Sequence, residues 1–511
     1  MHRALIISEI LNEIIAYFPG SDKALVALAA TCRTFQDPAL AVRWKRLYDF
    51  KSLIPLFPSD LWRELHPFNI EESDPSFYEF RRLPLNEDWI HFEQYTSRVR
   101  QIEIHCEAFE GMVRFMTTLS MRYLYNPSHA QRHLFPNLRE LVWHSQDITE
   151  LPFVTLFFPP SLRSLALQFD DDDERAPSLL LLLESQCLAL TPLRMYGCLG
   201  SDSVFSRALE SRSCRQLESL DCGEIDELAL WHLSQLPTLK DLSVRLPDLI
   251  STHMVCGDWF VKLQTLSLTA DDMTPIISFL QLAPLSLKGI KIHVMVAGVS
   301  PSLSPSQVLS TISSRLCHKV LTNIRIRVAL CQPRFEITLD ITALRPLCLF
   351  SKLRSIHIDR FCSFELNDDD LTELATAWPL LEELTLGPNR GWQRTSGITF
   401  KGLATLLRAC PLLHTLALVI DATRLCDISL TGSEVLNDRI ETLLLGDSII
   451  ERPAAVALIL DDLFWSLKHV DAWLMTDRAD EKLRYTPLWD EVNSHLLIGQ
   501  SRKTHRTTVR R

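Results

Sequence analysis

Glycine is scarce in this sequence, with 15 glycines among 511 residues. The glycine-rich patterns GxxxxGKS/T, GxGxxG and GxSxG, which hold phosphates or expose a nucleophile, do not occur. The acidic run DDDDE at 170–174 lacks the glycine and the terminal glutamate of a calcium-binding loop. The sequence therefore favours a protein that is not an enzyme, with no catalytic residues, no cofactor and no metal.

Closely spaced cysteines are also missing. The 13 cysteines form no CxxC, and the closest two are Cys214 and Cys222. Zinc sites and disulfide frameworks normally show tighter or repeated spacing. We therefore expect reduced thiols that pack as small apolar side chains.

Excess basic charge and long apolar runs are lacking as well. The net charge of −11 disfavours a nucleic-acid-binding protein, which is usually basic. The run SLLLLLESQCLAL is interrupted by Glu184 and is shorter than the about 20 residues of a membrane span. The first apolar stretch is broken by Glu9 and Glu13, unlike a signal peptide. We expect no nucleic acid and no membrane as partners, and a cytoplasmic or nuclear location.

What the sequence does contain is a recurring six-residue pattern with apolar first, fourth and sixth positions. The instances are VRQIEI at Val99, LRELVW at Leu138, LRSLAL at Leu162, LESLDC at Leu217, LKDLSV at Leu239, LQTLSL at Leu263, LKGIKI at Leu287, LTNIRI at Leu321, LRSIHI at Leu353, LEELTL at Leu381, LHTLAL at Leu413, IETLLL at Ile440 and LKHVDA at Leu467, with a weaker match, LRMYGC, at Leu193. The fourth and sixth positions point to one face of a strand. One strand cannot bury that face alone, but stacked neighbours can.

Helical patterns lie between these strands, as in LTELATAW (371–378) and FKGLATLLRAC (400–410). The region from Val99 to Ala472 resembles the leucine-rich-repeat family with long, ribonuclease-inhibitor-like units. The resemblance implies an α/β horseshoe with strands on the concave side and helices on the convex side. The Asn or Cys that often follows the last apolar position is missing from nearly every repeat, which predicts an irregular solenoid. RFEITLDITAL (334–344) alternates like a strand and could pair with the strand at Ile324 through the turn CQPR.

Three short helices are expected in the first 50 residues. SEILNEIIAYF (8–18) has one apolar face, and Pro19 and Gly20 end that helix. Asp22 is placed to cap a second helix, and Pro38 is placed to open a third. A module of this size has a thin core, so its apolar surface favours burial against a partner or the next domain.

This module resembles an F-box, through Glu9-Ile10-Leu11 followed by Ile14, an apolar helix with Leu25 and Leu28, the Cys32-Arg33 pair with Phe35, and the downstream Trp44. RWKRLYDFKSLIPLFP (43–58) is similar to the Trp-containing extension of fungal F-box proteins. Where the family usually has Leu-Pro, this sequence has Ile7-Ser8. The resemblance implies that the module binds a Skp-type adaptor on a cullin scaffold, while the solenoid captures a protein to be ubiquitinated. The implied adaptor-binding residues are Ile10, Leu11, Ile14, Leu25, Leu28, Cys32, Phe35 and Trp44.

The expected organisation has four parts: an F-box-like helical module (1–50), a helical or irregular linker (51–97), the leucine-rich-repeat solenoid (98–498) and a basic, disordered tail (499–511). The tail has five basic residues and no acidic one, so it could also be a nuclear-import signal. Two other interpretations remain open. Residues 7–47 could merely cap the solenoid, or the chain could be a leucine-rich-repeat scaffold for protein–protein interaction with no ubiquitin role.

Cationic side chains gather in the middle repeats of this acidic protein. In a repeat strand the residues between the apolar positions point to the concave surface. If the strands at Leu287, Leu321 and Leu353 are neighbours, they bring several of these cations together, where they would attract an acidic or phosphorylated partner. The expected substrate-binding residues are Lys291, His293, Arg325, Arg327 and His357.

Overall fold

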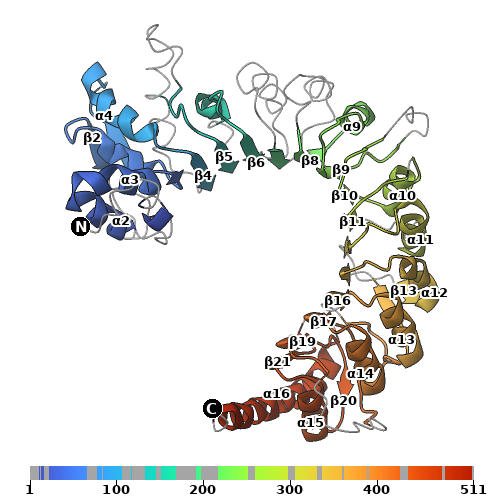
Figure 1. Ribbon diagram of the computed structural model, residues 1–511. Helices are drawn as coiled ribbons and strands as arrows, with labels where there is room; N and C mark the ends of the chain where they lie inside the picture. Colours follow the sequence, from blue (N-terminus) through green and yellow to red (C-terminus); the bar gives the residue numbers. More distant parts are fainter. Residues whose placement is uncertain are drawn as a thin grey trace. The chain divides into compact units, whose positions relative to one another are not determined.

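The computed structural model describes residues 11, 13–15, 22–65, 77–82, 84–105, 117, 133–144, 151–168, 192–196, 217–250, 259–282, 284–296, 305–330, 337–359, 362–387, 391–425, 436–474 and 478–508. The chain divides into two compact units, Met1–Leu239 and Lys240–Arg511. Each unit is of the α/β class, with parallel strand pairs that are connected through helices or loops (Figure 1). This confirms the expected class and the stacking of parallel strands.

Unit 1 begins with a small helical module. It contains α2 (Asp22–Thr31) and α3 (Arg33–Arg43), which pack against each other. The second helix starts at Asp22, as expected, but the prediction that Pro38 opens the third helix was wrong, because α3 starts at Arg33. Packing of Phe35 and Val42 against the module core outweighs the one backbone hydrogen bond that a proline removes.

Residues 51–97 have a core of their own. Their elements are η2 (Lys51–Leu56), β2 (Trp62–Leu65), β3 (Phe77–Phe80) and α4 (Asn86–Thr96), and β2 and β3 form an antiparallel pair. The Phe57 ring lies 5.2 Å from that of Trp89 and 4.7 Å from that of Phe92, centroid to centroid. Arg82 Nη1 donates to Asp88 Oδ2 at 2.7 Å and so ties β3 to α4.

The six-residue patterns form the parallel strands. In unit 1 these are β4 (Gln101–His105), β5 (Glu140–His144), β6 (Ser164–Gln168), β7 (Pro192–Tyr196) and β8 (Ser219–Glu224). β1 (Arg46–Leu47) comes before the patterns and pairs in parallel with β4. In unit 2 they are β9 (Asp241–Arg245), β10 (Thr265–Ala270), β11 (Gly289–Val296), β12 (Asn323–Leu330), β14 (Ser355–Asp359), β16 (Glu383–Leu386), β17 (Thr415–Ala417), β19 (Thr442–Leu444) and β21 (His469–Asp471). The patterns pair position for position, as in Leu141↔Leu165 and Leu266↔Ile290, and their apolar residues are buried.

Helices follow many of the strands. Unit 1 has α6 (Leu151–Val154), η3 (Thr155–Phe157) and α9 (Glu227–Ser234), and unit 2 has α10 (Met273–Leu282), α11 (Pro305–Arg315), α12 (Ile341–Leu344), η6 (Arg345–Leu349), α13 (Asp368–Ala377), α14 (Phe400–Ala409) and α15 (Pro453–Leu463). Within unit 2, α10 to α15 lie along one side of the sheet (Figure 1). The helices expected at 371–378 and 400–410 are confirmed as α13 and α14. Asn367 and Thr399 cap their first turns, because each side-chain oxygen accepts a backbone N–H.

Two minor parallel pairs lie beside the main sheet of unit 2. They join β13 (Ile337–Asp340) to β15 (Cys362–Glu365) and β18 (Asp421–Ala422) to β20 (Ile449–Ile450). The expected pairing of 334–344 with the strand at Ile324 was therefore wrong. β12 already has β11 and β14 on its two sides, so its edges are occupied.

The last element is α16 (Ala479–Thr508), which packs against α15 and β21. The α16 backbone extends through Thr508, into the range 499–511 that the sequence assigned to a basic tail. The Asn493 amide bonds the outer strand twice: it accepts from Val470 N at 2.8 Å and donates to Val470 O at 3.0 Å. In the described ranges, no helix is both long and apolar enough to cross a membrane.

Candidate functional site

Three adjacent strands of unit 2 bring together the five residues expected to bind a substrate. β11, β12 and β14 pair in parallel, and their register aligns side chains in rows across the sheet. One row contains Lys291, Arg325 and His357, and the next contains His293, Arg327 and Asp359. We call these five cationic or imidazole side chains, together with Asp359, the central patch.

Strand alternation separates the central patch from the core. Ile290, Ile292, Ile324, Ile326, Ile356 and Ile358 are each at most 2% exposed. The residues between them point to the other face, which is the face opposite the helices. Lys291, Arg325 and Arg327 are exposed there, whereas His293 and His357 are half-buried. The expected adjacency of these residues is thus confirmed, whereas their role in binding stays a prediction.

Positive charge dominates the central patch. Lys291, Arg325 and Arg327 form no side-chain hydrogen bond or ion pair with any residue that the structure describes. His357 Nε2 lies 3.9 Å from Asp359 Oδ2, and Asp359 is buried. Burial, and then the positive charge of Arg325, lower the pKa of His357 below its ordinary value, so the ring is neutral at pH 7.

This arrangement can bind an anion but has no catalytic geometry. Arginine presents a planar set of donors that matches carboxylate or phosphate oxygens. Neighbouring strands lie about 4.8 Å apart, so donors in one row can contact the same anionic group or adjacent ones. The patch contains no nucleophile paired with a base. Its donors are therefore suited to recognition.

The F-box-like residues are divided between the module core and its surface. Leu11 and Leu25 are buried in the module, and Trp44 is buried against Tyr95 with ring centroids 5.2 Å apart. Leu28, Cys32 and Phe35 are half-buried. Ile10 lies outside the described residues.

Two large apolar side chains in the helical segments of the module face solvent. Ile14 is 43% exposed, and Val26, which the sequence did not single out, is 49% exposed. Val26 belongs to the apolar helix DKALVALAAT. Helical spacing places Val26 on a different face from the buried Leu25, so its exposure could have been predicted from the sequence. Tyr48, after α3, is also exposed, at 58%, and completes the large apolar contact surface of the module among the described residues.

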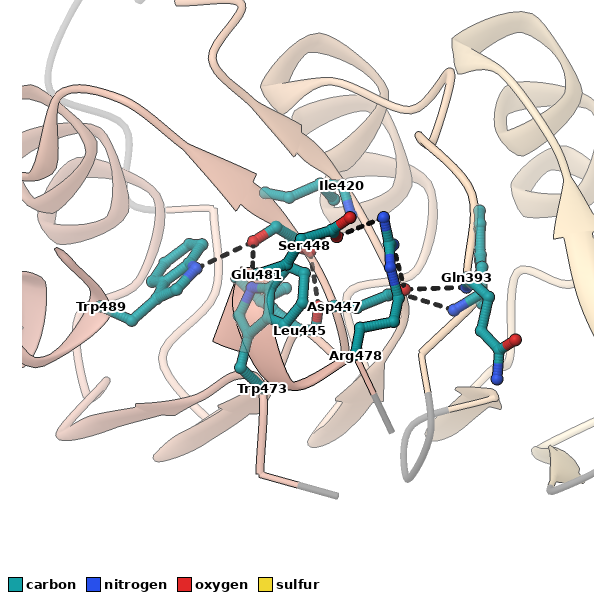
Figure 2. Close-up of polar contacts among 10 residues, drawn as sticks. Gln393, Ile420, Leu445, Asp447, Ser448, Trp473, Arg478, Glu481 and Trp489 are labelled. Carbon is teal, nitrogen blue, oxygen red and sulfur yellow. Dashed lines mark hydrogen bonds and ion pairs between the residues drawn. The ribbon is translucent and has the colours of Figure 1, made fainter. Parts of the chain in front are cut away.

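A second polar cluster in unit 2 is buried. Asp447 is 2% exposed, and its two carboxylate oxygens accept the backbone N–H groups of Trp392 and Gln393 at 2.7 and 2.8 Å (Figure 2). Arg478 Nη1 lies 3.4 Å from the same carboxylate and also pairs with Glu481. Burial raises the pKa of Asp447, although both backbone hydrogen bonds oppose this shift.

Ser448 extends this cluster into the C-terminal helix. Its hydroxyl accepts from Ile420 N at 2.8 Å, and its carbonyl accepts the indole N–H groups of Trp473 and Trp489 at 2.8 and 3.0 Å (Figure 2). The neighbouring Gly391 has a φ of +72°, and a Cβ there would collide with the Asp447 carboxylate. Because its groups bond one another, we interpret this cluster as structural.

Comparison with known proteins adds no assignment. No protein-family model matches the chain. No curated protein matches it in sequence. Any function must therefore be inferred from the residues of this chain.

Proposed function

We propose that this protein is the substrate-recognition subunit of a Skp-cullin-F-box ubiquitin ligase. The observation that carries the proposal is the order of its parts: a small helical module with exposed apolar side chains, followed by parallel-strand repeats with a patch of exposed cations. The module binds the Skp-type adaptor, and the repeats capture the protein to be ubiquitinated. The chain itself catalyses no reaction and acts in the cytoplasm, the nucleus or both.

The exposed apolar residues of the module support adaptor binding. Its described buried core is small, with Leu11, Ile15 and Leu25 as its members. Ile14 and Val26 remain available, and burial of a side chain of this size contributes about 1.5–3 kcal/mol. A protein surface that covers both residues would stabilise the module and the complex together.

The central patch supports substrate capture. Lys291, Arg325 and Arg327 are exposed and unpaired among the described residues, on a chain of net charge −11. An acidic or phosphorylated segment is the complementary ligand, because the patch attracts it over several ångströms and then donates hydrogen bonds to it.

Changing Ile14 to Asp tests adaptor binding without touching the module core. The full chain is co-expressed with a Skp-type adaptor, and the amount of adaptor that co-purifies is measured. We expect Ile14→Asp to weaken the complex by about tenfold or more, because one apolar contact is replaced by a charge. Leu458→Asp is the matched control, since Leu458 is 69% exposed on α15.

Adaptor binding at native strength by Ile14→Asp, with Leu458→Asp unchanged, would remove the F-box assignment. If the native chain captures proteins through the central patch but never co-purifies with the adaptor, the scaffold interpretation replaces the ligase one. Circular dichroism of both variants establishes that they are folded.

A further inference from the structure

A basic groove in unit 1 lies outside the central patch. Its volume is about 810 Å³, and it runs between α3, the end of α4 and the first residues of β4 and β5. One wall is apolar, with Pro38, Ala41 and Val42. The remaining lining residues are Lys45, Gln94, Ser97, Arg98, Arg100, Gln101, Arg139 and Glu140.

The cations of this groove are aligned by the strand register. Arg46, Gln101, Glu140 and Ser164 are in register across β1, β4, β5 and β6. Each is preceded by a cation, which gives the N-terminal row Lys45, Arg100, Arg139 and Arg163. Backbone bonds link its members in sequence: Arg100 N donates to Lys45 O at 2.9 Å, Arg139 N to Arg100 O at 2.8 Å, and Arg163 N to Arg139 O at 2.8 Å.

In unit 2, the second position of the six-residue pattern forms ion pairs between repeats. There Arg354 Nη1 pairs with Glu382 Oε1 of the next repeat at 2.6 Å. Lys468 Nζ likewise pairs with Glu441 Oε2 at 2.6 Å. Opposite charges on adjacent strands stabilise a sheet, whereas like charges destabilise it. The N-terminal row of four cations therefore opposes folding locally, which indicates a use other than stability.

No carboxylate of the described residues neutralises this row. Lys45, Arg139 and Arg163 have no side-chain partner there, and Arg100 Nη1 donates to the carbonyls of Ser97 and Val99. Asp37 pairs with Arg98, and Glu140, which lines the groove, accepts a hydrogen bond from the neutral amide of Gln101. Burial, and then the charge of Arg139, lower the pKa of Arg100 below its ordinary value.

We propose that the groove binds a phosphorylated peptide, with the phosphate monoester held by Lys45, Arg100 and Arg139. A phosphate carries about two negative charges at neutral pH and three acceptor oxygens, so one group can contact three cations from adjacent strands. The apolar wall contacts the residues that flank the phosphorylated side chain. This site is distinct from the central patch and does not depend on the ubiquitin role.

The test measures binding of a fluorescent pentapeptide, with a central phosphoserine flanked by alanines, to the full-length chain at low ionic strength. We expect saturable binding of the peptide to the native chain. Arg139→Gln should weaken this binding by about tenfold, because it removes one charge-assisted contact with the phosphate. Lys45→Gln is expected to act in the same direction. Arg163→Gln is the matched control, because Arg163 belongs to the row but does not line the groove.

Four outcomes would overturn the proposal. They are no binding by the native chain, equal loss with Arg163→Gln, equal binding of the unphosphorylated peptide, and equally tight competition by inorganic phosphate. Equally tight competition by inorganic phosphate would mean that the peptide residues around the phosphate contribute nothing to the affinity. Arg325→Glu with Arg327→Glu must leave binding intact, because both lie in the central patch. Arg139→Gln must melt no lower than the native chain, since it removes a like charge from the row.

Discussion

The two polar clusters of unit 2 use similar chemistry in opposite ways. In the central patch, Arg325 and Arg327 project into solvent and have no partner among the described residues. In the cluster around Asp447, a buried carboxylate, two backbone N–H groups and Arg478 are joined to one another. A charged group whose bonds are complete contributes to folding, and an exposed one without a partner is available for binding.

This contrast predicts that stability and capture respond to different substitutions. Changes at Asp447 should alter the free energy of unfolding and leave the surface of the central patch as it is. Changes at Arg325 and Arg327 should alter capture and leave unfolding nearly constant.

Changing Asp447 to Ala should have the largest effect. The substitution leaves the buried backbone N–H of Trp392 without an acceptor, removes the acceptor of the Gln393 N–H and removes one of the two carboxylates beside Arg478. Leaving a buried donor without its acceptor costs about 1–3 kcal/mol, and the lost ion pair with Arg478 adds to this loss. Urea denaturation followed by circular dichroism measures the loss.

Asp438→Ala is the control for that measurement. Asp438 is exposed, so its change is expected to alter stability by less than about 0.5 kcal/mol. A loss below about 1 kcal/mol for Asp447→Ala would contradict the interpretation of this cluster as structural.

Changing Arg325 and Arg327 together to Glu should abolish most capture. Each arginine contributes about 1.5–3 kcal/mol through charge-assisted hydrogen bonds, so we expect about a hundredfold weaker retention of the proteins that the native chain captures. Stability should change by less than about 0.5 kcal/mol, because both residues are exposed.

The control carries Arg408→Glu and Arg439→Glu, two exposed residues outside the patch, and has the same change in net charge. Quantitative mass spectrometry compares retained proteins at physiological salt. If the control loses as much capture as the patch variant, net charge and not the patch governs binding.

The smallest expected effect is a pH dependence carried by His357. Burial and Arg325 lower its pKa in the free protein, while Asp359 and Glu383 oppose this and Arg327 adds to it. A bound anion adds negative charge beside the ring and raises that pKa. Binding therefore takes up a proton, and affinity for a hexaglutamate peptide should increase about two- to fivefold as the pH falls below about 6.5.

His357→Gln should remove this pH dependence and keep the affinity at higher pH. The peptide affinity is measured by isothermal titration across the pH range, with Arg325→Glu and Arg327→Glu as the baseline for binding elsewhere. An unchanged pH profile in His357→Gln would exclude His357 as its source.

The repeat strands and the central patch could be predicted from the sequence because both follow from local spacing. The pattern LKGIKI fixes which residues of β11 are buried, and the similar interval to LTNIRI and LRSIHI makes Lys291, Arg325 and His357 neighbours. The N-terminal row was missed, although VRQIEI, LRELVW and LRSLAL all have Arg at the second position. Lys45 lies outside any such pattern, and its 55-residue separation from Arg100 gives no regular interval.

Other features depend on contacts that local spacing does not encode. β13 pairs with β15 and not with β12, because both edges of β12 are already paired with β11 and β14. This outcome depends on three strands that are distant in the sequence. The cluster at Asp447 joins residues 391–393 to 447 and 478, which lie far apart in the sequence. A lone Asp after a strand gives no sign that it will be buried and satisfied by a distant turn.

The two bonds from Asn493 to Val470 have a consequence for self-association. An outer strand normally offers its free N–H and C=O groups to any other chain that presents an extended segment, and so templates polymers. At β21 the Asn493 amide takes the place of that incoming chain at Val470. A further strand could otherwise add to the open edge of β21 and extend the sheet. The Asn493 side chain occupies the backbone groups of Val470 that such a strand would need.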